Sequence, residues 1–412
     1  MPSSALAKAP VTPFSPYQKF VVGALAFLQF AVILDFMLMA PLGALIMPAL
    51  KIGPKEFGFV VSAYAFSAGA ASLLTAGFAD RFDRKRLLLI FYSGFVVGTL
   101  WCGLAQSFES LLLARVVTGL FGGVIGSIVL AIAADLFPLA MRGRVMGTIQ
   151  TAFAASQVLG LPVGLYLSSR WNWHLPFIAM AVLGLLGGAV VAWRMQPVTE
   201  HLAKKQAHSP WRHLLHTVAV PRHALAFATT ALLTTGGFML MPFSTAFAVN
   251  NLGIAMADLP TVYLVTGLCT IVVGPLVGRA ADAFGTFRVF TAGTALSIVM
   301  VLLYTHLGPI PLVGLIVVNA VMFVGIFSRM IPFQAISSSV PEPAQRGAYN
   351  AVAASVQQLS GGVASVVAGH IVTLGANGRL LHFEWIGYVV VATSLAAFAL
   401  LRTLVRSGPV AH

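Results

Sequence analysis

The carboxylates are the residues of this chain that are most informative about chemistry. The 412 residues include eleven acidic ones, and ten of them lie between long apolar runs or at their ends: Glu56, Asp80, Asp83, Glu109, Asp135, Glu200, Asp258, Asp282, Glu342 and Glu384. Asp35 alone lies well inside an apolar run. Because a carboxylate is costly there, it usually faces a cavity and marks a path for protons or substrate. We therefore predict that Asp35 exchanges protons; the alternative is a structural Asp bonded to backbone.

Two cations, Arg115 and Arg329, also lie inside apolar runs. Counted from the cytoplasmic ends of their helices, Asp35 lies roughly 24 Å deep and Arg115 roughly 30 Å deep at 1.5 Å per residue. Helix tilt can absorb this difference, so we predict that Arg115 is the counter-charge of Asp35. Arg329 has three open roles: it could reach Asp35, bind helix carbonyls or meet an anionic substrate.

The composition indicates what kind of protein carries these residues. The chain is 58% hydrophobic and only 8% charged, whereas soluble domains are nearer 45–50% apolar and about 25% charged. This predicts a polytopic membrane protein. The net charge of +13 fits loops that face anionic lipid and the cytoplasm, and we expect no nucleic-acid partner. Cys102 and Cys269 lie in apolar runs and are interpreted as buried thiols.

About twelve apolar runs are each long enough to cross ~30 Å of hydrocarbon. We predict helices at 20–48, 57–79, 87–106, 109–136, 144–169, 173–194, 223–250, 259–281, 287–306, 309–338, 347–374 and 383–404. With both termini inside, eighteen of the 24 Lys and Arg residues fall on the cytoplasmic side, and four fall outside: Lys51, Lys55, Arg170 and Arg379. This asymmetry predicts that both termini are cytoplasmic.

The runs divide into two similar halves. We predict a cytoplasmic tail at 1–19, a six-helix bundle at 20–194, a cytoplasmic linker at 195–222, a second bundle at 223–404 and a cytoplasmic tail at 405–412. The segment "ADRFDRKR" has a counterpart in "ADAFGTFR", and "MRGRVMG" has one in "QRGAYN", at offsets of 202 and 204 residues. Parallel six-helix repeats are a transporter plan with the substrate site at their interface near the midplane.

Several motifs resemble those of the major facilitator superfamily. They are "GFADRFDRKR", "RVVTGLFGG", "DLFPLAMRGRVMG", "ILDFMLMAPLGALIMPAL" and "GPLVGRAADAFG". Ala76, directly before the first motif, and Asp83 within it occupy the two positions where the family has glycine. The motif "ILDFMLMAPLGALIMPAL" resembles the first helix of proton-coupled drug and sugar efflux antiporters. The resemblance covers essentially the whole chain and implies an all-α fold of twelve transmembrane helices in two pseudo-symmetric bundles.

The resemblance also implies roles for individual residues. The signature loop latches the inner gate in the family, so we expect gating residues at Asp80, Arg81, Arg84, Asp135, Arg142, Asp282 and Arg346. Helices one and four line the cavity in the family, which supports the pairing of Asp35 with Arg115. Asn319 lies at the equivalent of Arg115 in the second half, so proton coupling is expected in the first half only. The fifth-helix segment "ASQVLGLPVGL" keeps Gly160 and Gly164 of the antiporter pattern, with its proline displaced to Pro162.

Candidate substrate contacts are polar or adaptable side chains inside the runs. Seven aromatic and Met side chains could line an apolar pocket: Phe36, Met37, Met39, Met239, Met241, Phe243 and Phe247. Glutamines are further candidates, because polar groups avoid lipid; interhelical hydrogen bonding is their alternative role. From these we select as substrate-binding residues Phe36, Met39, Gln150, Gln157, Met239, Phe243, Asn319, Arg329 and Gln357.

Phosphate loops, catalytic triads and zinc signatures are absent from the sequence, so we expect no enzyme activity, metal or cofactor. We predict a monomeric transporter of a bacterial inner membrane that exports a drug-like compound, sugar or metabolite in exchange for protons, by alternating access. Its partners would be the substrate, protons and membrane lipids. The alternatives are import or facilitated diffusion of a sugar or organic anion and, in a different class, a membrane receptor that does not transport.

Overall fold

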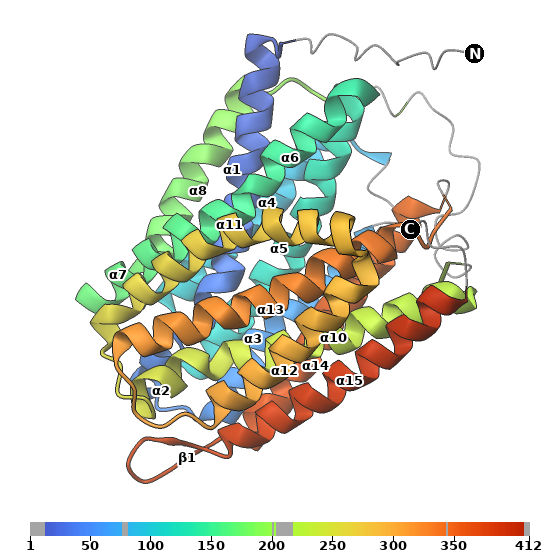
Figure 1. The fold of residues 1–412 in the computed structure, drawn as a ribbon. Helices are drawn as coiled ribbons and strands as arrows, with labels where there is room; N and C mark the ends of the chain where they lie inside the picture. The colour runs from blue at the N-terminus through green and yellow to red at the C-terminus, as the bar shows by residue number, and fades with distance from the viewer. Residues whose placement is uncertain (1–12, 76–80, 200–201, 203–216, 343–344, 408–412) are drawn as a thin grey trace.

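A computed structural model describes residues 13–75, 81–199, 202, 217–342 and 345–407 of the chain. Within these residues twelve helices are long and apolar enough to cross a membrane. A membrane offers the backbone no water, so each span must form its hydrogen bonds within its own helix. The fold is therefore all-α in its spanning part, as the sequence predicts, and Figure 1 shows the helices in two groups.

The first group runs from blue to green in Figure 1. It contains α1 (Pro16–Met39), α2 (Gly43–Leu50), α3 (Pro54–Thr75), α4 (Arg84–Leu104), α5 (Phe108–Leu136), α6 (Leu139–Ala155), the π-helix η2 (Ser156–Gly160), α7 (Leu161–Arg170) and α8 (Leu175–Arg194). The segments α6, η2 and α7 follow one another without a break and form the fifth span.

The second group runs from yellow-green to red. It contains α10 (Pro221–Asn250), the 3₁₀ turn η4 (Met256–Asp258), α11 (Leu259–Phe284), α12 (Thr286–Thr305), α13 (Leu312–Ser338), α14 (Arg346–Ile371) and α15 (Phe383–Arg406). Before α15, strands β1 (Thr373–Leu374) and β2 (Leu380–Leu381) pair antiparallel, with Thr373 opposite Leu381. The sequence analysis did not predict this short hairpin.

Local sequence explains where several helices begin and end. Ser15 and Gln18 form a reciprocal capping box at the start of α1. Asp83 caps α4 by accepting a hydrogen bond from the Lys85 amide. The predicted helix over 20–48 is wrong in one respect, because α1 ends at Met39 and a separate helix, α2, follows. Pro41 explains the break, since proline removes a backbone donor and disfavours helix in the residue before it.

Three clusters of buried apolar residues show how the two groups are joined. One cluster contains residues of both halves, among them Met47, Phe57, Phe243 and Ala368. A second cluster lies within the first half, and a third lies within the second half. The shared cluster lies toward the end of the bundle that carries α2 and β1, at the lower left in Figure 1.

The tightest contact between the halves lies at this same end, between α3 and α14. A Cβ atom on Gly58 would lie 2.8 Å from the Ser365 carbonyl oxygen and 3.2 Å from the Gly369 Cα. One on Gly369 would lie 2.8 Å from the Pro54 carbonyl oxygen. Because side chains at these positions would push the helices apart, the two glycines permit the halves to close here.

Candidate functional site

Asp35 and Arg115 form the ion pair expected from the sequence. The Arg115 Nη1 atom lies 2.7 Å from the Asp35 Oδ2 atom, and both side chains are fully buried. The hydroxyl of Thr99 donates to the other carboxylate oxygen at 3.1 Å. α1, α4 and α5 thus each place one polar group at this point, and both oxygens of the carboxylate have a donor.

The guanidinium of Arg115 retains unused hydrogen-bonding capacity. Its Nε and Nη2 atoms are buried without a partner in the described part of the chain. Its Cζ atom lies 4.6 Å from the centre of the Tyr64 ring, so the cation also contacts an aromatic face. Neutralising the carboxylate would leave this buried cation without its counter-charge, which is costly, so a conformation that offers the guanidinium another partner would then be favoured.

A row of aromatic rings leads from this pair toward the second half. The Phe36 ring, next to Asp35 in the chain, lies 5.2 Å from the Tyr64 ring and 5.7 Å from the Phe238 ring, measured between centres. Phe238 belongs to α10 and lines two cavities. The ion pair is therefore connected to these cavities through packed side chains.

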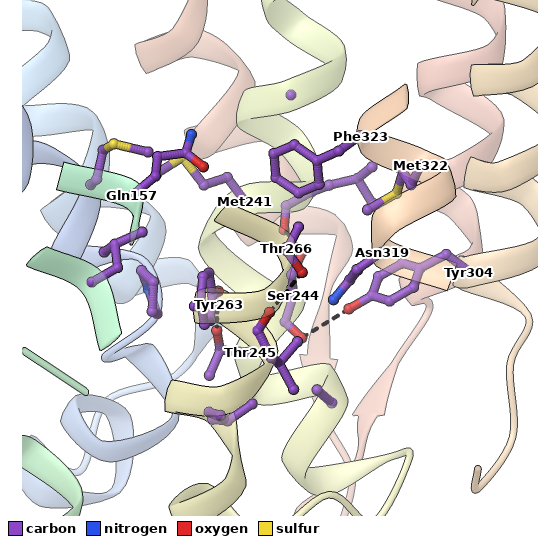
Figure 2. Close-up of a pocket in the computed structure, with 18 of the residues that line it drawn as sticks. Gln157, Met241, Ser244, Thr245, Tyr263, Thr266, Tyr304, Asn319, Met322 and Phe323 are labelled. Carbon is purple, nitrogen blue, oxygen red and sulfur yellow. Dashed lines mark hydrogen bonds between the residues drawn. The ribbon is translucent and has the colours of Figure 1, made fainter. Parts of the chain in front are cut away.

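The larger cavity has a volume of about 280 Å³ and lies against α1, η2, α7, α10, α11, α12 and α13. Figure 2 shows the polar side chains in its mainly apolar wall. Two hydrogen bonds join residues of this wall: the Tyr304 hydroxyl donates to the Ser244 carbonyl, and the hydroxyls of Thr245 and Tyr263 share a hydrogen bond. No charged residue in the described part of the chain lines this cavity.

Four of the nine predicted substrate contacts lie at the cavities. Gln157 and Asn319 line the larger cavity. Arg329 and Gln357 line a smaller one of about 170 Å³. Neither the Gln157 nor the Asn319 side chain forms a hydrogen bond with another described residue, so both amide groups can bind a ligand in the cavity.

The other five predicted contacts lie elsewhere. Met39, Met239 and Phe243 are fully buried in the cluster shared by the two halves. Gln150 is exposed on α6, and Phe36 lies in the aromatic row. The sequence analysis did not single out Thr99, Tyr64 or Phe238. Thr99 and Tyr64 carry no distinguishing signal in an apolar run, because hydroxyl groups are common in membrane helices.

Among the predicted gating residues, Arg84 and Asp135 form an ion pair, with Nε and Oδ2 3.2 Å apart. Arg142 donates to two backbone carbonyls, of Ala134 and Phe137. Arg81, Asp282 and Arg346 are exposed. Asp80 lies outside the described residues.

Twelve spanning helices in two groups, a buried ion pair and cavities within the bundle define a polytopic transport protein. Residues 25–365 match the family profile of the Major Facilitator Superfamily. The chain therefore belongs to the major facilitator superfamily, and it is a membrane-embedded transporter of small molecules rather than an enzyme.

Named relatives and solved structures agree with this assignment. The chain is 28% identical to the MFS-type transporter YceJ of Bacillus subtilis (strain 168), over 74% of this chain and 76% of the relative. It is 29% identical to Multidrug resistance protein 3 of the same organism, over 36% of this chain and 29% of that protein.

In the solved structures, the nucleoside transporter NupG superposes with a TM-score of 0.74 at 12% identity, covering 94% of this chain and 99% of NupG. A bacterial homologue of the human lysosomal transporter Spinster, inward-facing and occupied, also gives 0.74, at 16% identity, covering 96% of this chain and 98% of that one. At these identities the likeness concerns the fold alone.

Proposed function

We propose that this protein is a secondary active transporter that exports a small, mainly apolar organic molecule in exchange for protons. Alternating access would carry the molecule, and Asp35 would bind a proton from one side and release it to the other. The observation that carries this proposal is the buried pair of Asp35 and Arg115, because the described part of the chain has no other carboxylate buried within a span.

The pair has the properties of a proton switch. Protonation of Asp35 would remove the attraction between the two side chains, and Arg115 has two unpaired donors with which to find new partners. Both side chains are fully excluded from solvent in this conformation. Proton exchange therefore requires a second conformation, which is what coupling demands.

Packed side chains link the proposed proton site, Asp35 and Arg115, to the cavities in which the transported compound would bind. Phe36 contacts both Tyr64, which lies against Arg115, and Phe238, which lines the cavities. If both termini are cytoplasmic, as the basic residues predict, the end closed by Gly58 and Gly369 is the outer end. The conformation would then be inward-facing, ready to take cargo from the cytoplasm, and the name of one relative, Multidrug resistance protein 3, favours export.

Purified protein in liposomes that contain a pH-sensitive dye tests the proposal. An imposed pH gradient should be discharged by one class of added compound from a panel of ethidium, arabinose and 2-naphthoate. In the Asp35→Asn variant, which keeps the size of the side chain but cannot titrate, we expect the coupled proton flux to fall at least tenfold. Downhill exchange of labelled for unlabelled compound should survive, because it needs no change in protonation.

Asp258→Asn is the matched control. It makes the same chemical change at the start of α11, where Asp258 forms no ion pair with a described residue. Its proton flux should equal that of the unmodified protein. If Asp35→Asn still concentrates the compound against its gradient and responds to a protonophore as the unmodified protein does, the proposal is wrong.

A further inference from the structure

Arg329 is a buried cation that the proton-coupling site does not use. Its residue is 7% exposed on α13, and its Nε atom has no hydrogen-bond partner. Among the described residues it forms neither an ion pair nor a hydrogen bond. The described acids of this half, Asp258, Asp282, Glu342 and Glu384, lie at or beyond helix ends. A buried charge without a partner is costly, so a ligand that supplies the opposite charge would be favoured.

The side chain lines a small chamber that carries further polar groups. The smaller cavity, of about 170 Å³, lies between α10, α12, α13, α14 and α15. Ser297 contributes a second buried group without a partner, its Oγ atom. Thr234 and Gln357 add a hydroxyl and an amide. Donors thus converge on the chamber, and among the described residues Arg329 is the only charged one that lines it.

The chamber adjoins the larger cavity. Both are lined by Gly237, Phe238, Leu240 and Ile326. A Cβ atom on Gly237 would meet no other atom within 4 Å, so the shared wall has open space at this residue. A ligand can therefore have one group beside Arg329 and the rest of its body in the larger cavity, whose wall is mainly apolar and uncharged.

We propose that Arg329 binds the carboxylate of an amphipathic organic anion, whose apolar part occupies the larger cavity. The planar guanidinium fork matches a carboxylate, with which it forms two parallel hydrogen bonds. The apolar wall favours an aryl or alkyl body over a sugar. This inference rests on the proposed transport function and names the class of its cargo.

Equilibrium binding to the full-length protein in detergent tests this inference without transport. The probes are 2-naphthoate and its neutral analogue 2-naphthamide, which have the same aromatic body. We expect naphthoate to bind at least tenfold more tightly than naphthamide. Arg329→Gln should abolish this preference, and Arg329→Lys should keep part of it, since it retains the charge but not the fork.

Two further variants separate the charge from the shape of the site. Gln357→Glu places a carboxylate in the same chamber and should compete with naphthoate while leaving the unfolding temperature unchanged or higher. Gly237→Val should fill the open part of the shared wall and weaken both probes. Gly278→Val is its control, because a Cβ atom there also meets nothing within 4 Å but the residue lines neither cavity.

The possible results decide the inference. Equal affinity of the unmodified protein for both probes would overturn it. Equal affinity of Arg329→Gln and the unmodified protein for naphthoate would also overturn it. So would chloride binding that depends on Arg329 while naphthoate binding does not. Asp35→Asn should keep the preference for naphthoate, so this inference can hold even if proton coupling through Asp35 fails. Proton coupling can likewise hold even if naphthoate shows no preference for Arg329.

Discussion

Arg115 in the first half and Arg329 in the second half are both buried in membrane-spanning helices, α5 and α13, yet only Arg115 has a carboxylate partner. At the repeat offset of 204 residues, Arg115 corresponds to Asn319 and Arg329 corresponds to Ile125. The two halves therefore carry their cations at different depths of equivalent helices. Neither charge is repeated at the equivalent position of the other half.

The surroundings of the two cations differ in the same way. Arg115 lies among fully buried side chains and lines neither described cavity, whereas Arg329 lines a chamber next to the larger cavity. This difference shows that one fold can bury a charge in two ways, beside a counter-charge or facing an open cavity. On our proposals, the first half handles the proton and the second half handles the cargo.

The largest expected effect is a difference in the free energy of unfolding between two matched variants, Arg115→Met and Arg329→Met. Arg115→Met would leave the Asp35 carboxylate buried without its counter-charge, which costs about 3–5 kcal/mol when one partner of a buried pair is removed. Arg329→Met removes a charge that has no described partner, so we expect no loss of stability. Thermal unfolding in detergent, followed by tryptophan fluorescence, measures both.

The double variant Asp35→Asn with Arg115→Met serves as the control, because it removes both charges. It should regain most of the stability lost in Arg115→Met. Equal losses in Arg115→Met and Arg329→Met would show that the two cations are held alike and would break the comparison.

A smaller effect is expected where the halves meet. Gly58→Val would crowd the Ser365 carbonyl and Gly369, and such overpacking costs about 1–3 kcal/mol. The strain exists only while this end is closed, so the population should shift about fivefold or more toward the state that is open here. Distances between spin labels at Arg170 and Arg379, in a background without Cys102 and Cys269, would increase. Gly278→Val should leave them unchanged; an unchanged distribution in Gly58→Val as well would exclude a role of this contact in closure.

The ion pair and the fold could be predicted from sequence because their signals are rare or long. Apolar runs of about twenty residues fix the spans, and only three charged residues lie deep within them. Asp35 and Arg115 could therefore be matched by similar depth, together with the family resemblance, which places helices one and four at the cavity. The Arg329 chamber could not be placed, since its open space depends on helix packing and on the bare backbone of Gly237.

The larger cavity was predictable only in part, for a physical reason. Core, lipid-facing and cavity-lining positions use the same apolar side chains. Met239 is fully buried in the core, whereas Met241, two residues further along α10, lines the larger cavity. Sequence gives the residue type, and Pro41 accounts for the break after Met39, but the direction of each side chain follows from packing.

The smallest expected effect concerns the link between the two halves. Phe36 joins the Tyr64 ring beside Arg115 to the Phe238 ring at the cavities, and an aromatic pair contributes about 0.5–1.5 kcal/mol beyond the area it buries. Phe36→Leu keeps an apolar side chain but loses both ring contacts. If these contacts transmit the protonation of Asp35, the affinity for the transported compound should change less with pH than in the unmodified protein. The reduction should be about threefold to tenfold, the factor that about 1 kcal/mol of lost coupling represents. Phe30→Leu, on the same helix but without a described ring contact, should keep the full dependence on pH. An unaltered pH dependence in Phe36→Leu would show that proton and cargo are coupled only through the movement of the halves as rigid bodies, and the aromatic row would then be packing alone.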